Sequence, residues 1–176
     1  MKSFKFLIIL VYFFTSCNAQ DQQPQTDVVE QTNNEINEET IPNEEEPTTT
    51  ESVMVQNVTS TGQENNYSLN VTLASPDTGC DQYADWWEVV TESGELIYRR
   101  ILTHSHVNEQ PFTRSGSNIN ITADQIVIIR GHVNNLGYGT TVFKGSINTG
   151  FEAEILEEGF ASNLSESEPL PTGCAF

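Results

Sequence analysis

An alternation of apolar and polar residues is the feature that most restricts the folds open to this chain. In the segment 67–74, Tyr, Leu, Val and Leu occupy every second position, and Ser, Asn and Thr stand between them. A period of two places successive side chains on opposite faces and is typical of a strand with one buried face. No apolar set recurs at helical spacing over three turns. The sequence therefore predicts an all-β fold.

Further strands are predicted from short β-rich runs separated by turn signals. The runs are 53–55, 86–90, 96–102, 119–121 and 126–129, and a last one begins at Val142. Between 86–90 and 96–102 stands Gly94, which supplies the positive φ that a hairpin turn needs, so these two runs are expected to pair. Turn signals recur about every eight to twelve residues, which favours an antiparallel sandwich.

The N-terminus has the ingredients of an export signal. Lys2 and Lys5 precede an apolar run over 6–14, and small residues follow before Cys17. The apolar run is about nine residues long, whereas a membrane span needs roughly 20. The segment therefore predicts a signal peptide over residues 1–16 and not a transmembrane helix.

The residues before Cys17, Phe-Thr-Ser, resemble the bacterial lipoprotein signal, with Phe14 where that family prefers Leu. The resemblance implies cleavage before Cys17, acylation of its thiol with a palmitate-type chain, and membrane anchoring through that lipid. Asn18 stands where the family's inner-membrane retention signal has Asp, which implies the outer membrane, on its periplasmic or its surface face. The alternative is an ordinary signal peptide cut after Ala19, which would release a soluble protein.

Residues 17–51 are predicted to be a lipid-anchored, disordered acidic linker. From Asp21 to Glu51 the chain carries mainly Glu, Gln, Asn, Thr and Pro and no aromatic residue. Such a segment cannot bury enough apolar surface to offset its ordering entropy. The formal net charge of the whole chain is −18, and because phosphate backbones are bound by clustered Lys and Arg, nucleic acid is disfavoured as a partner.

Residues 52–176 have the length of one domain, and one segment carries a family resemblance. The sequence 126–139, Ile-Val-Ile-Ile-Arg-Gly-His-Val-Asn-Asn-Leu-Gly-Tyr-Gly, resembles the F strand and the F–G loop of fibronectin type III and related immunoglobulin-like domains. Ile126 replaces the aromatic residue of that family near the start of the F strand. The resemblance covers about 20 residues and implies an antiparallel immunoglobulin-like sandwich, with Trp86 and Trp87 on the C strand. It supports a fold, whereas a function has to be argued from a site.

Two cysteines remain once Cys17 is assigned to lipid. Cys80 and Cys174 are an even pair in an exported protein, which predicts a disulfide between them. Closing a loop of about 95 residues would be worth about 4 to 5 kcal/mol in the chain-entropy model. The bond would hold an acidic tail after Gly150 against the loop before Trp86. A thiolate metal site or a redox couple would be the alternatives, and neither has the Cys-x-x-Cys spacing that it needs.

All three histidines of the chain lie in the domain, as His104, His106 and His132. On an extended strand the His-x-His pair would place both rings on one face about 7 Å apart. A third histidine from another strand could complete a zinc or copper site, with Glu109 or Asp85 as a fourth ligand. The alternative is that these are ordinary histidines and that the first two lie in a loop.

The adjacent Trp86 and Trp87 raise the possibility of a carbohydrate platform or a partner contact. Neighbouring residues on a strand point to opposite faces, so one Trp is expected to be buried and the other exposed. By the same rule Arg99 and Arg100 are expected to point to opposite faces of the strand. One of them is expected to pair with Glu88 or Glu95 in a salt bridge at the exposed rim of the sheet, worth about 0 to 1 kcal/mol.

No catalytic signature is present in the sequence. It has no Gly-x-Ser-x-Gly elbow and no Gly-rich phosphate loop. Ser105, His132 and Asp85 could be combined into a Ser-His-Asp set, but many sequences permit such a combination. The predicted function is that of a bacterial envelope lipoprotein acting as a non-catalytic binding or assembly module for an envelope protein or glycan. The alternatives are a zinc- or copper-binding envelope protein and a surface glycan-binding accessory protein.

Overall fold

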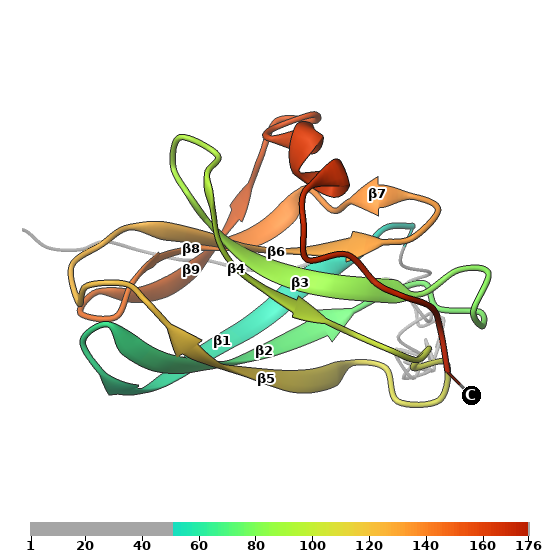
Figure 1. Ribbon diagram of the computed structural model, residues 1–176, viewed down its shortest axis with the longest axis horizontal. Coiled ribbons are helices and arrows are strands. Elements are labelled where there is room, and N and C mark those ends of the chain that lie inside the picture. Colours follow the sequence, from blue (N-terminus) through green and yellow to red (C-terminus); the bar gives the residue numbers. More distant parts are fainter. Residues whose placement is uncertain (1–50, 176) are drawn as a thin grey trace, which may run out of the picture. The chain divides into compact units, whose positions relative to one another are not determined.

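The computed structural model describes residues 51–175, and they form an antiparallel β-sandwich (Figure 1). The predicted signal peptide, the predicted lipidation site Cys17 and the predicted linker up to residue 50 lie outside the described residues. The strands are β1 (Met54–Gln63), β2 (Asn66–Ala74), β3 (Ala84–Thr91), β4 (Leu96–Ile101), β5 (Phe112–Ile119), β6 (Val127–Val133), β7 (Gly137–Tyr138), β8 (Thr141–Ser146) and β9 (Gly150–Ile155), followed by a 3-10 helix, η1 (Ser162–Glu166).

The two sheets have the strand order expected for an immunoglobulin-like sandwich. One contains β1, β2 and β5 in that order, and the other has the order β4-β3-β6-β8-β9, with β7 paired to β6. The sheet of β1, β2 and β5 thus faces the sheet that contains β3, β4, β6 and β8. In immunoglobulin-like domains, strands A, B and E face strands C, C′, F and G in the same way. The predicted fold class is confirmed, with 86–90 on the third strand and 127–133 on the sixth.

The core lies between the sheets and is built by the alternation seen in the sequence. Leu69, Val71 and Leu73 of β2 are fully buried and belong to the same apolar cluster as Trp87 and Val89 of β3. A Cβ on Gly116 of β5 would lie only 2.6 Å from the Trp87 ring. A glycine is therefore required where this ring meets the facing sheet.

One strand contradicts the sequence analysis. The segment after Gly150 was expected to be an acidic tail, but β9 pairs with β8 from Ser146 opposite Gly150 to Thr141 opposite Ile155. Every residue of β9 except Phe151 is exposed, because it is the edge strand of its sheet. The alternating Glu residues of this strand face water, which is why its composition resembled that of a tail.

The outward face of the larger sheet is covered by the end of the chain. We call residues 156–174 the C-terminal strap; at the red end of the colour bar in Figure 1, it runs from β9 across β6 and β3. Leu164 of the strap is buried with Val90, Ile128 and Val142 of the sheet, and Phe160 packs against the same cluster. All seven residues of β6 are therefore buried, which agrees with the continuous apolar run at 126–129 in the sequence.

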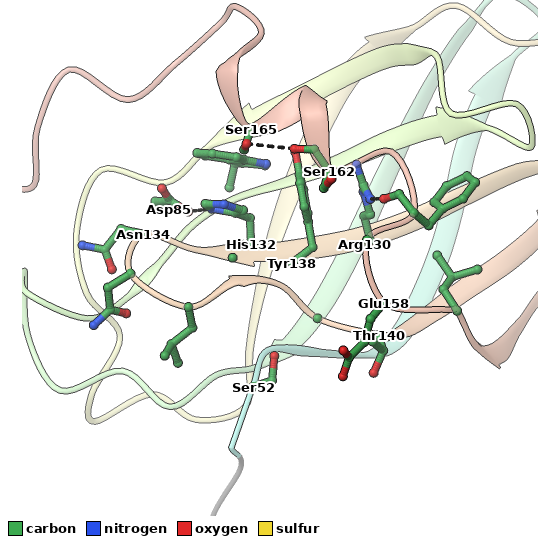
Figure 2. A pocket seen from close by; sticks show the side chains of 18 of the residues that line it. Ser52, Asp85, Arg130, His132, Asn134, Tyr138, Thr140, Glu158, Ser162 and Ser165 are labelled. Atoms are coloured by element: carbon green, nitrogen blue, oxygen red, sulfur yellow. Dashed lines mark hydrogen bonds and ion pairs between the residues drawn. The ribbon is translucent and has the colours of Figure 1, made fainter.

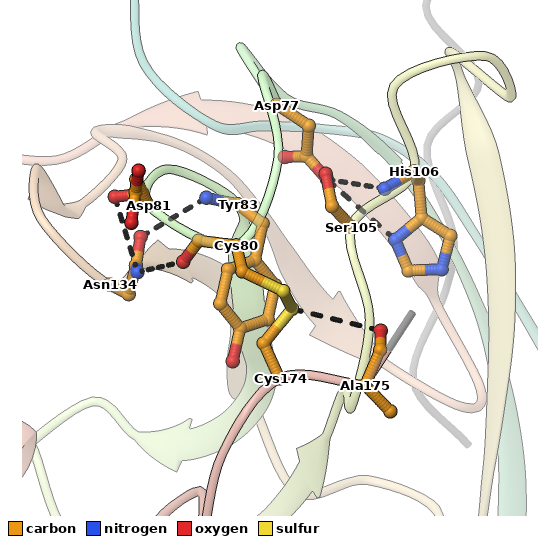
Figure 3. The surroundings of a disulfide bond; sticks show 9 residues. All are labelled: Asp77, Cys80, Asp81, Tyr83, Ser105, His106, Asn134, Cys174 and Ala175. Carbon is orange, nitrogen blue, oxygen red and sulfur yellow. Dashed lines mark hydrogen bonds and ion pairs between the residues drawn. A yellow bond between two sulfur atoms is a disulfide. The ribbon is translucent and has the colours of Figure 1, made fainter.

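The predicted disulfide is confirmed and holds the end of the strap. Cys80 lies in the loop before β3, and its Cα is 5.6 Å from that of Cys174 (Figure 3). The bond joins residues 94 positions apart. It therefore ties the end of the strap to the edge of the face that the strap covers.

Candidate functional site

A buried cluster of three charges lies on the outward face of the larger sheet, beneath the strap. Glu88 of β3 stands opposite Arg99 of β4 and Arg130 of β6. Its Oε2 is 2.6 Å from Arg99 Nη2 and its Oε1 is 2.7 Å from Arg130 Nη2. One of Arg99 and Arg100 was expected to pair with Glu88 or Glu95, and Arg99 pairs with Glu88. The expected place at an exposed rim was wrong, because the strap buries all three side chains.

The two arginines also hold the backbone of the strap. Arg99 donates to the carbonyl oxygens of Leu164 at 2.7 Å and Ser167 at 2.6 Å. Arg130 donates to the carbonyl oxygens of Phe160 and Ala161, the latter at 3.0 Å. The strap is thus fixed by charge-assisted hydrogen bonds in addition to its apolar contacts.

A cavity of about 1030 Å³ opens between the strap and the sheet. Its walls come from the start of β3, from the stretch between β6 and β8, and from the strap, with Ser52 at the start of the described chain (Figure 2). The lining combines aromatic rings with hydroxyl, carboxamide and carboxylate groups. This mixture is typical of small-molecule sites in proteins.

A buried Asp-His pair lies in the wall of this cavity. Asp85 Oδ1 is 2.7 Å from His132 Nδ1, and the two residues are 4% and 6% exposed. The Trp86 ring stacks on the imidazole with centroids 3.7 Å apart and planes 6° apart. The Tyr138 ring meets the imidazole edge-on, with centroids 4.7 Å apart. These contacts hold the imidazole in one orientation.

The two tryptophans point to opposite faces, as expected, but neither is exposed. Trp87 is fully buried in the core, and Trp86 is 3% exposed beneath the strap. The prediction of one exposed Trp was wrong because the strap covers the face that would otherwise meet water. Trp86 lines the cavity, whereas Trp87 has no access to it. Stacking of a sugar ring on an open Trp face is therefore not available at this pair.

The three histidines lie in two different environments. His132 is in the cavity wall, whereas His104 and His106 lie in the loop between β4 and β5. His106 stacks on Phe112 with centroids 3.8 Å apart. Among residues 51–175, no three His, Cys, Asp or Glu side chains gather in a way that could hold a metal ion.

The predicted zinc or copper site is therefore not formed by His104, His106 and His132. The His-x-His pair is not on a strand, because the carboxylate of Asp77 accepts a hydrogen bond from the His106 backbone N–H at 2.8 Å and holds the loop (Figure 3). Burial lowers the pKa of His106 to about 4. Glu109, considered as a fourth ligand, instead pairs with Arg114 at 2.7 Å.

The Ser-His-Asp combination is only partly assembled. Asp85 and His132 do pair, but Ser105 donates instead to Asp77 at 3.4 Å. The pair is therefore left without the serine that the sequence analysis placed beside it.

The phenol groups of the cavity remain protonated over a wide pH range. Burial, followed by the nearby charges of Asp85 and Asp77, raises the pKa of Tyr83. Burial, followed by the charge of Glu88, raises the pKa of Tyr138 to about 12. Both groups can therefore act as hydrogen-bond donors at neutral pH.

Several cavity residues were missed by the sequence analysis, including Tyr83, Asn134, Tyr138 and the strap residues Glu157 and Glu158. One signal could have pointed to the site. Arg130 and His132 stand at alternate positions of the apolar run that forms β6, opposite Glu88 and Trp86 of β3. Polar groups at alternate positions of two buried strands indicate a polar site on the covered face. The residues of the strap could not have been found in this way.

Comparison with known proteins gives one informative similarity. A protein of Halomicrobium mukohataei named "Putative lipoprotein" is 44% identical to this chain over 71 residues. The chain is similar to a protein named as a lipoprotein. The aligned region is 40% of this chain and 35% of the other, so the chain spans about a third of the length of that relative. The similarity supports a lipoprotein and carries no information about a ligand.

The remaining comparisons add no further relationship. No family model and no solved structure matches the chain. Within residues 51–175, no helix is long and apolar enough to cross a membrane.

Proposed function

We propose that this protein is a lipid-anchored lipoprotein of the bacterial cell envelope and that its sandwich domain is a non-catalytic binding module. The cavity between the strap and the larger sheet is the ligand site. The observation that carries the proposal is the Asp85–His132 pair, which is buried in the wall of an open cavity of about 1030 Å³. Burying such polar groups costs free energy, and in a site they can fix the orientation of a ligand.

The anchoring part of the proposal rests on the sequence and on the similarity to the Halomicrobium protein. Acylation of Cys17 would attach the chain to the outer membrane. Between the lipid and the described domain stand about 30 residues, which as a flexible chain would have a typical reach near 30 Å. The domain would thus meet its ligand or partner away from the membrane surface.

Metabolic labelling with an alkynyl palmitate tests the anchor. We expect the label on the wild-type chain in the outer-membrane fraction and its loss in Cys17→Ser. Cys174→Ser is the matched control and should keep the label. A wild-type protein that is unlabelled and soluble would contradict the anchoring.

A ligand panel tests the binding module. The unfolding midpoint of the full-length protein in detergent is measured with amino acids, polyamines, sugars and dicarboxylates. We expect at least one of these classes to raise the midpoint of the wild type but not of His132→Gln. His104→Gln, with the same substitution at an exposed site outside the cavity, should behave as the wild type. If no class shifts the wild-type midpoint, the cavity is not a ligand site.

A further inference from the structure

We infer that the cavity binds an organic cation, a small molecule that carries a protonated amine or guanidinium. The inference rests on the proposed function, because it names the class of ligand for the same cavity. It follows from which charges in the lining are free and which are already used.

Asp85 supplies a buried carboxylate with free hydrogen-bonding capacity. The residue lines the cavity and is 4% exposed. Its Oδ1 is bonded to His132, whereas Oδ2 accepts no hydrogen bond from any side chain or backbone group of residues 51–175. The hydrogen bond between Oδ1 and His132 fixes the orientation of the carboxylate. A ligand with a positively charged N–H group would donate a hydrogen bond to Oδ2 and would also compensate the negative charge of the carboxylate.

Two more carboxylates lie in the strap. Glu157 and Glu158 line the cavity, and in Figure 2 Glu158 and Asp85 lie on either side of Tyr138. The described residues show no salt bridge to either glutamate. Negative charge is therefore present in two separate parts of the lining.

The positive charge in the lining is already compensated. Arg130 is the one Lys or Arg among the described residues that line the cavity. Its guanidinium is bound to Glu88 and to the carbonyl oxygens of Phe160 and Ala161. Glu157 and Glu158 have no such partner among the described residues, and Asp85 is paired through Oδ1 alone, with His132, so an anionic ligand would meet repulsion. The formal charge of the whole chain, −18, adds attraction for a cation at longer range.

The walls suit the hydrocarbon part of such a ligand. Tyr83, Leu136, Tyr138 and Phe160 line the cavity, and aromatic and aliphatic side chains pack against methylene groups. The Arg130 guanidinium already lies over the Tyr138 ring, 3.6 Å from its centroid, so these walls contribute apolar contact. The volume of about 1030 Å³ accommodates a chain of several methylene groups. A neutral sugar would find no open Trp face, because Trp86 is 3% exposed.

Calorimetric titration of the full-length protein in detergent tests the inference. The probes are putrescine, spermidine and arginine, with 1,4-butanediol as the uncharged counterpart of putrescine and with glucose and citrate as a neutral and an anionic probe. We expect binding of at least one amine probe and none of butanediol. Raising NaCl from about 50 to 500 mM should weaken the binding, because salt screens partly exposed charges.

Variants locate the binding. We expect Asp85→Asn to weaken amine binding about tenfold or more, since a charge-assisted hydrogen bond is lost. Because Asp85 is buried and its variant could misfold, the exposed pair Glu157→Gln/Glu158→Gln provides a second test, with an expected loss of several-fold. Glu166→Gln makes the same change in the strap outside the cavity and should bind as the wild type.

The possible outcomes distinguish failure of the inferred ligand class from failure of the proposed binding function. If glucose or citrate binds in a manner that His132→Gln abolishes and no amine binds, the ligand class is wrong and the binding function stands. If nothing in the panel binds, both are wrong. If amines bind equally to the wild type, to Asp85→Asn and to the double variant, the binding reflects general attraction to an acidic surface and the inference is overturned.

Discussion

The substitution Glu88→Gln should remove much of the stability of the domain. Glu88 is fully buried and lies 2.6 Å and 2.7 Å from the guanidinium nitrogens of Arg99 and Arg130. Glutamine has nearly the same volume, so the change removes charge and leaves packing in place. Two buried guanidiniums would then have no carboxylate to neutralise them and would keep only neutral hydrogen-bond acceptors, such as the carbonyl oxygens of the strap.

The expected loss follows from the cost of an uncompensated buried charge. Removing one partner of a buried ion pair costs about 3–5 kcal/mol, out of a total of about 5–15 kcal/mol for a domain. With a urea dependence of about 1–3 kcal/mol per molar, the unfolding midpoint should fall by roughly 2 M. Because Arg99 donates to the carbonyl oxygens of Leu164 and Ser167 and Arg130 to those of Phe160 and Ala161, amide exchange in the strap should also become faster.

Urea titration followed by tryptophan fluorescence measures this loss. Glu95→Gln, in the exposed turn between β3 and β4, is the matched control and should change the free energy of unfolding by less than about 0.5 kcal/mol. A loss below about 1 kcal/mol for Glu88→Gln would refute the reasoning. It would mean that the two guanidiniums are solvated well enough without the carboxylate.

Two further predictions concern the disulfide and the loop between β4 and β5. The double variant Cys80→Ser/Cys174→Ser should lose about 4 kcal/mol of unfolding free energy in the chain-entropy model, and an unchanged urea midpoint would contradict this. The pKa of His106 is lowered to about 4 from an ordinary value near 6.5, so the unfolded chain binds more protons and stability is lost as pH falls from about 6.5 to about 4. Between pH 7 and pH 5 the wild type should lose up to about 2 kcal/mol more than His106→Gln, and equal losses in the two proteins would show that His106 does not carry the effect.

The sequence predicted those parts of the structure that depend on local patterns. The alternation in 67–74 predicted which side chains of β2 point inward, namely its leucines and valine. Gly94 marked the turn of the β3–β4 hairpin. The even pair Cys80 and Cys174 indicated the disulfide. These features depend on the period of a strand, the φ angle of one residue and the pairing of two cysteines, all of which can be argued without the fold.

The candidate site could not be predicted in this way. Asp85 and His132 are 47 residues apart, and their pairing depends on the antiparallel register of β3 with β6. From the sequence, both residues were candidates for a metal site and for a Ser-His-Asp set, because spacing alone does not show which side chains converge. The cavity also needs Glu157 and Glu158, which look like ordinary solvent-facing charges in the sequence.

The sequence by itself predicted the strand class, the hairpin and the disulfide, and its N-terminal pattern predicts an export signal and a lipid anchor. The tertiary structure decided which face of the larger sheet is exposed. A strand pattern shows that Trp86 and Glu88 share one face of their strand, but it does not show that His132 lies beside them or that residues 156–174 fold back over that face. The physical reason is that periodicity is set by the backbone of neighbouring residues, whereas burial of a face depends on a segment far along the chain.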